Sequence, residues 1–507
     1  MSTAVAEARP DRPKTPAEYV RTVIRRDQIS KYMTGDQDFI PDGEIERLLA
    51  ANARPDSRRV RDIIAKSLAI QTLTPEETAV LLNVTDPQLV AEMEEAAGRV
   101  KHKVYDNRIV FFAPLYMSSL CVNNCLYCGF RTENRHEVRR RLSMDEVRAE
   151  TEVLAGQIGH KRLIVVYGEH PTSAADYIAE TIRTVYGVVT QTRRGSAQIR
   201  RVNVNAAPMS VEDLGILKQA GIGTYQVFQE TYHRGTYAAV HPANTVKGDF
   251  RWRLYCMHRA LEAGIDDVGM GVLFGLHDWR FEVMGLLCHA RELEARFNLG
   301  PHTISFPRLE PASGSALATN PAARVSDADF RRLIVVLRLA VPYPGMIVTA
   351  RESAATRNAV IPLGCTQVDA STRLGIGAYS DTTPDQQIHR QQFMLGDTRS
   401  LEELITYLAG QGIITSFCTA GYRCGRTGGC IMDMLKTGKE GKFCKVNAVL
   451  TFREWLDDFA SPEALRLCTP VLESEIAEIK ATFTPAFVKG FLEHYRRIEA
   501  GERDLYF

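Results

Sequence analysis

Three cysteines in one short segment have the type and spacing best suited to chemistry, in the run Cys121-Val-Asn-Asn-Cys125-Leu-Tyr-Cys128. Thiolates are soft ligands that suit iron–sulfur clusters. Three thiolates on a four-iron (4Fe-4S) cluster leave one iron open, and a cofactor can chelate that iron. The alternatives are a structural zinc site or three unpaired core thiols, but zinc usually takes four ligands and the segment supplies no fourth Cys or His.

The spacing of these cysteines resembles the signature of the radical SAM superfamily, in which S-adenosylmethionine (SAM) binds the open iron. An aromatic residue before the last cysteine, here Tyr127, is usual in that signature. The resemblance implies Cys121, Cys125 and Cys128 as metal ligands and Tyr127 as part of the cofactor site. Residues 107–116 are predicted as a strand, and the cysteines follow it as a loop. Loops after barrel strands are where α/β barrels place their active sites.

Composition excludes several classes of protein. The 62 basic and 61 acidic residues balance, so no basic surface for nucleic acid is predicted. No apolar run approaches the length of a membrane-spanning helix, and residues 1–14 lack the apolar core of a signal peptide. The 11 cysteines, three of them in the motif, favour a reducing compartment over a disulfide framework. We therefore expect a cytoplasmic protein that binds neither nucleic acid nor membrane.

Four regions follow one another along the chain. Residues 1–38 are polar and are predicted as a mobile or loosely docked N-terminal extension. Residues 39–104 have a helical pattern, in which Thr74 is a helix cap followed by Pro at the first helical position. Residues 105–380 alternate between strands and helices. Residues 381–507 break this rhythm and are predicted as a mostly helical C-terminal auxiliary domain.

The alternating region predicts a barrel. Its expected strands are residues 107–116, 162–167, 201–205, 223–228, 267–273, 302–306 and 345–349. Repeated βα units predict a parallel sheet with right-handed crossovers, hence an α/β fold of the radical SAM (β/α)8 TIM-barrel type. Barrel enzymes carry their chemistry just after the strands, although some polar residues there only cap helices. The polar residues at these positions are Glu169, Asn203, Asn205, Gln229, Glu230, Arg308 and Arg351.

Stretches spread over residues 40–507 resemble the HydG family, the radical SAM tyrosine lyases that mature FeFe-hydrogenase. Besides the cysteine loop, the matching stretches are residues 74–83, 199–205, 221–225, 229–234, 264–269, 300–305, 423–428, 447–451 and 501–507. A more distant resemblance is to the 2-iminoacetate synthase ThiH, which lacks the C-terminal appendage. The resemblance implies a lyase that uses a 4Fe-4S cluster and SAM to break the Cα–Cβ bond of tyrosine, giving dehydroglycine and p-cresol. In the HydG family a second cluster then makes CO and cyanide on a labile iron.

The resemblance also assigns roles to cofactor-binding residues. Gly168 and Glu169 match the motif that holds the amino group of SAM. Arg201, Asn203 and Asn205 correspond to contacts with SAM or with the substrate. These five residues are therefore expected to lie with the cysteine loop.

Two further residues are implied in the reaction itself. Arg351 resembles the arginine that pairs with the substrate carboxylate, a role that suits its bidentate guanidinium. The run before it is Val348-Thr-Ala-Arg351, where the family favours Ser-Thr-Arg, so the neighbouring hydroxyl contact is in question. His302 resembles the family's ligand to the labile iron. The alternative for His302 is a core histidine at the start of a strand.

The C-terminal domain departs from the family at its second cluster. The family has Cys-Thr-Ala-Cys there and a third cysteine downstream, whereas this chain has Cys418-Thr-Ala-Gly421 and then Cys444. Glycine cannot ligate, so one ligand is missing and a second iron–sulfur cluster becomes doubtful. Cys424 and Cys430 lie close by in a Gly-rich stretch, and either could rebuild the site with Cys418 and Cys444. Otherwise both are ordinary buried thiols and the second cluster is lost.

The sequence supports several functions. The first is a tyrosine lyase with an altered or lost second cluster, and a rebuilt cluster would instead make a full maturase that supplies CO and cyanide for the hydrogenase H-cluster. A lyase for another aromatic amino acid, such as tryptophan, is the next alternative. The last is a catalytically idle assembly partner, against which the intact cysteine motif argues. The enzymes need an amino-acid substrate and a low-potential electron donor, and a maturase also needs other hydrogenase-maturation proteins.

Overall fold

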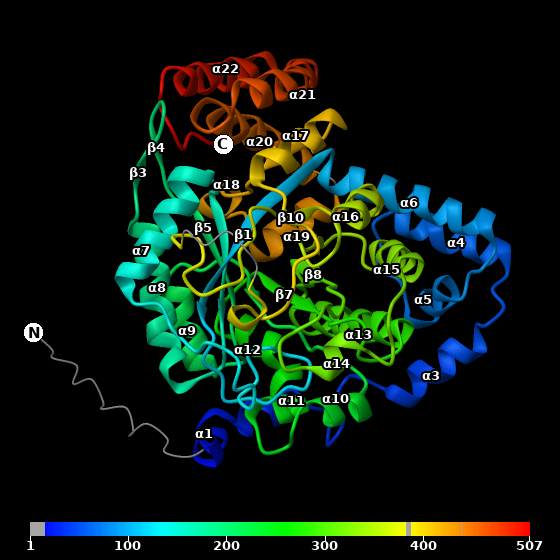
Figure 1. Ribbon diagram of the computed structural model, residues 1–507. Helices are drawn as coiled ribbons and strands as arrows, with labels where there is room; N and C mark the ends of the chain where they lie inside the picture. The colour runs from blue at the N-terminus through cyan, green and yellow to red at the C-terminus, as the bar shows by residue number, and fades with distance from the viewer. Residues whose placement is uncertain (1–15, 382–386, 438) are drawn as a thin grey trace, which may run out of the picture.

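Eight parallel strands form a closed barrel at the centre of the molecule, seen in a computed structural model that describes residues 16–381, 387–437 and 439–507 (Figure 1). The strands are β1 (Arg108–Ser118), β2 (Arg162–Tyr167), β5 (Arg201–Asn205), β6 (Tyr225–Gln226), β7 (Val268–Gly271), β8 (Thr303–Ser305), β9 (Gly345–Val348) and β10 (Gln367–Asp369). They pair in this order, and β10 pairs back to β1. This confirms the predicted barrel. The last strand, β10, was not among the predicted strands.

Helices pack outside the barrel between successive strands. They include α7 (Met144–Glu152), α8 (Ala175–Gly187), α9 (Val211–Gln219), α12 (Cys256–Glu262), α13 (Trp279–Phe297), α15 (Asp327–Ala340) and α16 (Ala354–Val360). Several begin at a side chain that accepts a backbone N–H of the first turn, which satisfies a group that the helix itself leaves unpaired. These caps are Ser143, Ser210, Asp278, Ser326 and Ser353.

The N-terminal helices precede the barrel, and the later ones among them, from residue 42 onward, lie together on one side of it (Figure 1). They are α1 (Pro16–Val23), α2 (Asp27–Ser30), α3 (Asp42–Ala51), α4 (Ser57–Leu68), α5 (Pro75–Leu82) and α6 (Pro87–Tyr105). Thr74 caps α5, as predicted, and the structure adds a capping box with Glu77. Residues 1–15 of the predicted extension lie outside the described residues, and in the remainder Ile29 packs in a buried cluster with Trp252.

The C-terminal region covers the amino end of the barrel strands. Its elements are α17 (Leu401–Gly410), β11 (Ile414–Ser416), α18 (Ala420–Arg423), α19 (Gly428–Lys436), α20 (Lys439–Asp458), α21 (Pro462–Thr482) and α22 (Pro485–Glu499). Strand β11 pairs in parallel with the first residues of β1, Arg108 to Val110. The C-terminal region is therefore joined to the barrel through the sheet itself.

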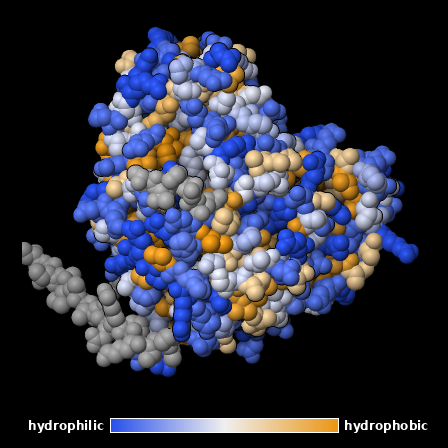
Figure 2. Space-filling model, viewed as in Figure 1, coloured by the Kyte–Doolittle hydropathy of each residue, from blue (hydrophilic) through white to orange (hydrophobic). Residues whose placement is uncertain are grey.

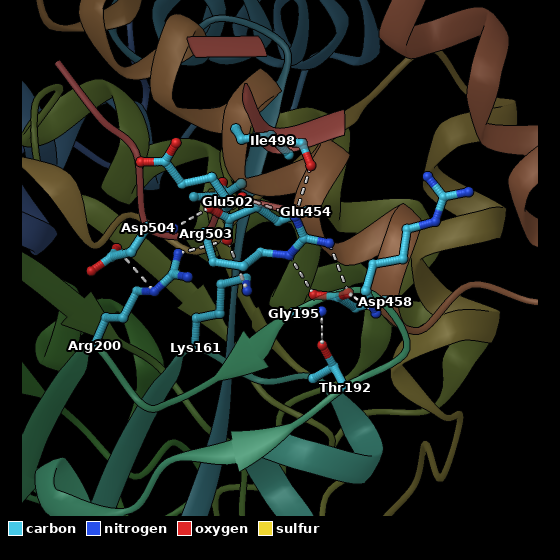
Figure 3. A network of polar contacts seen from close by, with 12 residues as sticks. Lys161, Thr192, Gly195, Arg200, Glu454, Asp458, Ile498, Glu502, Arg503 and Asp504 are labelled. Atoms are coloured by element: carbon cyan, nitrogen blue, oxygen red, sulfur yellow. Dashed lines mark hydrogen bonds and ion pairs between the residues drawn. The ribbon is translucent and has the colours of Figure 1, made fainter. Parts of the chain in front are cut away.

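Buried ion pairs hold helix α20 and the chain end against the barrel (Figure 3). Glu454 on α20 lies 3.1 Å from Lys161 Nζ and 2.8 Å from Arg200 Nη1, residues that immediately precede β2 and β5. Near the chain end, Arg503 Nε lies 2.7 Å from Asp458 on α20. Because the side chains that carry these charges are all almost fully buried, each depends on its partner.

The surface of the molecule is mixed in polarity. Figure 2 shows hydrophobic residues in scattered groups among charged and polar ones on the visible face. Among the described residues, no helix combines the length and apolar character needed to cross a bilayer.

Candidate active site

The three motif cysteines lie in the loop after β1, at the carboxyl end of the barrel. Cys121, Cys125 and Cys128 line one pocket there. The same pocket is lined by other residues singled out in the sequence, namely Tyr127, Gly168, Glu169, Asn205, Glu230 and Arg351. Parallel strands bring their carboxyl ends to one rim of a barrel, which is why residues more than 200 positions apart meet here.

The end of β2 approaches the cysteine loop closely. A Cβ on Gly168 would lie 2.3 Å from the carbonyl oxygen of Leu120, so only glycine allows this approach. Asn123, within the cysteine loop, donates a hydrogen bond to Oε2 of Glu169. The other oxygen, Oε1, is buried and has no hydrogen-bond partner in the described part of the chain. A buried carboxylate oxygen left without a partner fits an ammonium ligand such as the amino group of SAM.

The three thiols fit a cluster better than a single ion. Burial raises the pKa of Cys121 to about 11 and that of Cys125 to about 12, so both thiols stay protonated until a metal displaces the protons. Among the described residues, no group of three or more His, Cys, Asp or Glu side chains is arranged to hold one metal ion. In an iron–sulfur cluster each thiolate binds a different iron, so the sulfurs need not converge on one point.

Two cations beside the cluster loop were not identified from the sequence. Lys247 Nζ lies 2.7 Å and Arg253 Nη2 lies 3.2 Å from Oε1 of Glu230. Burial would raise the pKa of Glu230, but Lys247 and Arg253 outweigh burial and lower it. The Lys247 N–H also donates to Asn123 Oδ1 at 3.0 Å. Glu230 was flagged because it follows a strand, whereas Lys247 and Arg253 stand in no motif and reach the site only through folding.

Tyr127, within the cysteine loop, is buried. Its hydroxyl oxygen is 2.8 Å from His241 Nε2. Burial raises the pKa of Tyr127 well above its ordinary value, so the phenol remains neutral. The aromatic ring therefore forms a fixed apolar wall next to Cys128 in the pocket.

Arg351 also lines this pocket. Its guanidinium carbon is 3.3 Å from the centre of the Phe393 ring, and burial lowers its pKa. Thr349 precedes Arg351 by two residues and also lines the pocket. Its Oγ1 is buried without a hydrogen-bond partner among the described residues. A hydroxyl is therefore available beside Arg351 although Ala350 has none.

An apolar cluster from β1, β2 and β9 forms part of the pocket wall. It consists of Phe112, Ile164 and Ile347, which contact one another and line the pocket. On β5, alternate residues face the barrel interior at successive levels. Asn205 lines the pocket, whereas Asn203 accepts a hydrogen bond from the Thr224 N–H and Arg201 lies at the opposite end of the strand. The structure therefore does not bring Arg201 and Asn203 to the cysteine loop.

A second group of sequence-predicted residues meets at the amino end of the barrel. Cys418 follows β11 and is hydrogen-bonded to Cys444 on α20, which lowers the pKa of the Cys418 thiol. His302, just before β8, has its Nε2 3.1 Å from the hydroxyl oxygen of Tyr422. The guanidinium carbon of Arg201 lies 3.3 Å from the centre of the Tyr422 ring. Tyr422 therefore stands between His302 and Arg201.

Comparison with protein families matches two models to the barrel region. The Radical SAM superfamily model matches residues 115–286, and the Biotin and Thiamin Synthesis associated domain model matches residues 305–414. The chain is 31% identical to 2-iminoacetate synthase of Salmonella typhimurium over 353 residues, which are 69% of this chain and 88% of that relative.

Comparison with solved structures decides the family. A crystal structure of HydG, a maturase of the FeFe-hydrogenase, matches with 44% identity and a TM-score of 0.87 over 93% of this chain and 100% of that chain. HydG from Carboxydothermus hydrogenoformans matches with 34% identity and a TM-score of 0.73 over 94% and 98% of the two chains. The chain belongs to the HydG family of radical SAM enzymes. Membership implies a 4Fe-4S cluster and SAM, which the residues of the carboxyl-end pocket fit.

This HydG-family chain differs from the family pattern at its amino-end site. Gly421 lies in α18, where an added Cβ would have its nearest neighbour, an Arg426 oxygen, at an ordinary 3.7 Å. Cys424 and Cys430 are both exposed, whereas Cys444 is buried. The expectation that Cys424 and Cys430 are buried thiols is therefore wrong.

Proposed function

We propose that this protein is a radical SAM tyrosine lyase that breaks the Cα–Cβ bond of L-tyrosine, releases dehydroglycine and p-cresol, and holds no second cluster. One observation carries the proposal: the pocket that contains the three motif cysteines also contains Arg351. An amino acid bound through its carboxylate therefore lies beside the SAM site. The likeness to HydG and to 2-iminoacetate synthase supports the same chemistry.

In this proposal the cysteine loop holds the cofactors. Cys121, Cys125 and Cys128 bind the 4Fe-4S cluster, and Glu169 accepts hydrogen bonds from the amino group of SAM. When bound, the cluster and SAM supply the hydrogen-atom abstraction that starts the reaction. Asn123 fixes the Glu169 carboxylate by its hydrogen bond to Oε2 and leaves Oε1 to face the ligand.

The substrate is held by Arg351 and Thr349. The Arg351 guanidinium forms two hydrogen bonds with the substrate carboxylate, because its fork matches that geometry. Phe393 stacks on the guanidinium and keeps its plane fixed. Thr349 offers the hydroxyl that Ala350 lacks. The ring of the substrate packs against aromatic side chains of the pocket, which exclude water from the reaction.

Dehydroglycine leaves from the pocket without further conversion. At the amino-end site only Cys418 and Cys444 remain as thiol ligands, and Gly421 contributes none. A metal site depends on ligand number and geometry, so a cluster held by two thiolates is labile. Tyr422 already contacts His302 at 3.1 Å, the residue that would hold a labile iron.

An anaerobic assay tests this function. The protein, reconstituted with iron and sulfide, is incubated with SAM and tyrosine, with dithionite in place of the low-potential donor. We expect p-cresol and 5′-deoxyadenosine in equal amounts, and no CO trapped by deoxyhaemoglobin. If the protein forms no p-cresol from tyrosine but cleaves tryptophan, tryptophan is its substrate. Absence of SAM cleavage with every amino acid would contradict an enzymatic function.

The full maturase is the second candidate, and one observation favours it. The match to HydG extends over 93% of the chain and so includes the C-terminal domain. Stoichiometric CO in the assay above would establish this function and would require Cys424 or Cys430 to move inward as a replacement ligand.

A further inference from the structure

The segment of residues 389–393 crosses the cysteine loop at the rim of the pocket. The Val138 N–H donates to the carbonyl of His389 at 3.1 Å, and the Gly129 N–H donates to the carbonyl of Gln392 at 3.4 Å. A Cβ on Gly129 would lie 2.8 Å from that Gln392 oxygen, which belongs to the backbone and cannot swing aside. Gly129, directly after the last motif cysteine, therefore permits a close approach that holds Gln392 against the loop.

The side chain of Gln392 joins two residues of the pocket. Its Nε2 lies 3.5 Å from the sulfur of Cys128 and donates to it, and its Oε1 accepts a hydrogen bond from the Tyr116 hydroxyl at 3.0 Å. Tyr116 is itself buried on β1. The amide is therefore held from both ends.

The chemistry of the two ends fixes which way the amide points. A metal-bound thiolate carries no proton and can only accept, so the NH2 of Gln392 and not its carbonyl must face Cys128. The carbonyl then faces Tyr116, whose hydroxyl can donate. Hydrogen bonds to cluster sulfurs are among the features that set the reduction potential of an iron–sulfur cluster, because they stabilise the more negative reduced form.

We propose that Gln392 is a positioning residue for the cluster, whose amide donates to the Cys128 thiolate and raises the reduction potential of the cluster. This inference rests on the proposed function, because it assumes that the three motif cysteines hold the cluster. It adds Gln392, which lies outside the cysteine motif, to the residues that act on that cluster. The reaction starts with reduction of the cluster. With the hydrogen bond from Gln392, a weaker reductant can reduce the cluster than would be needed without that hydrogen bond.

Redox titration of the reconstituted cluster without SAM, followed by EPR, tests this inference. Gln392→Met keeps the length of the side chain and removes the donor, and Gln392→Leu removes it with a different shape. We expect both variants to keep the iron content of the wild type and to show a lower midpoint potential. The matched control is Gln391→Met, because Gln391 is the neighbouring glutamine and donates to Met394 Sδ at 3.3 Å. Its potential is expected to stay at the wild-type value.

The outcomes separate this inference from the proposed function. A full cluster with an unchanged potential in both Gln392 variants would overturn the role of Gln392 and leave the lyase intact. An equal shift in the Gln391 variant would also overturn it, because the effect would then belong to the segment and not to the hydrogen bond. A wild-type protein that forms no reducible cluster would overturn the proposed function and this inference together.

Discussion

The guanidinium carbon of Arg351 lies 3.3 Å from the centre of the Phe393 ring. A cation stacked on an aromatic face keeps its N–H groups in the plane parallel to the ring, where they remain free to bind a planar anion. Arg351 thus has a fixed orientation before any substrate binds. The stacking partner comes from the segment that also carries Gln392, so one stretch of chain supports both the substrate end and the cluster end of the pocket.

Replacing Arg351 should weaken substrate binding. Loss of a charged hydrogen bond costs about 1.5–3 kcal/mol, so Arg351→Ala is expected to raise the KM for tyrosine by about ten- to a hundredfold. SAM cleavage without substrate should persist, because Arg351 makes no contact with the cysteine loop in the proposal. Arg351→Lys keeps the charge and should recover only part of the loss. An unchanged KM for tyrosine in Arg351→Ala would remove this residue from the substrate site.

Replacing Thr349 tests the hydroxyl beside Arg351. Thr349→Val preserves shape and removes the hydroxyl, and one lost hydrogen bond costs about 0.5–1.5 kcal/mol. We expect the KM for tyrosine to rise by about two- to tenfold while the KM for SAM stays constant. Thr415→Val is a control on β11, remote from the pocket. Equal effects of the two substitutions would show that Thr349 acts through folding alone.

Replacing one motif cysteine should abolish the first step. Cys125→Ala leaves two thiolates in the loop, and such a cluster is expected to be lost on reconstitution. The measurement is 5′-deoxyadenosine formed from SAM and dithionite, together with the EPR signal of the reduced cluster. Cys256→Ala is a suitable control, because Cys256 is a buried thiol on α12 that bonds only weakly to Tyr225 at 3.7 Å. Full SAM cleavage by Cys125→Ala would refute the radical SAM assignment of the loop.

Restoring a thiol at position 421 should restore the second cluster. The structure leaves room there, since the nearest atom to an added Cβ is 3.7 Å away. Gly421→Cys is expected to raise the iron content from about four to about eight atoms per chain and to produce CO from tyrosine, given one added four-iron cluster. Gly421→Ala, which adds bulk without a ligand, should do neither. A wild-type protein that already binds eight iron atoms per chain would contradict this prediction.

Breaking the buried network at Glu454 should loosen the C-terminal region. Glu454→Gln leaves Lys161 buried without its ion-pair partner and leaves Arg200 with Asp504, 3.0 Å from its Nε, as its counter-charge. A broken buried pair costs about 3–5 kcal/mol. We expect a clear fall in thermal unfolding temperature at pH 7. Glu76→Gln, at the exposed pair with Arg59, should have almost no effect.

The same network gives a pH dependence. Burial alone would raise the pKa of Glu454, but Arg200 and Lys161 outweigh burial and lower the pKa from 4.5 to about 2. A carboxyl with a depressed pKa contributes stability that is complete above its ordinary pKa and is lost as the pH falls through its folded value. The stability difference between wild type and Glu454→Gln should therefore shrink as the pH falls from 4.5 towards 2. A difference that stays constant over this range would contradict the ion pair.

Much of the barrel could be predicted because its strands and helices alternate in a regular pattern. Strands β10 and β11 were not predicted. Both pair with β1, which lies far earlier in the chain, so the contact that stabilises them has no local sequence pattern. Helix α5 was recognised at its cap, because Thr74 is followed by Pro at the first helical position.

The site could be predicted in part for a similar reason. The cysteines were identified by their spacing, and Glu169 by its position after a predicted strand and by the resemblance of Gly168-Glu169 to a family motif. Arg201 and Asn203 share a strand with Asn205, and the sequence alone did not distinguish the two ends of that strand, which face different sites. The contact of Tyr422 with His302 joins residues 120 positions apart, and it depends on how the C-terminal region docks.

Strand β11 completes the hydrogen bonding of β1 at residues 108–110. A protein truncated before β11 would leave that end of β1 with an open edge of backbone N–H and carbonyl groups. An open strand edge readily pairs with a second chain, and aggregation follows. The barrel of this chain is therefore not a module that can be excised and expressed at residue 380. Any shorter version needs a strand, from this chain or from a designed peptide, to occupy that edge.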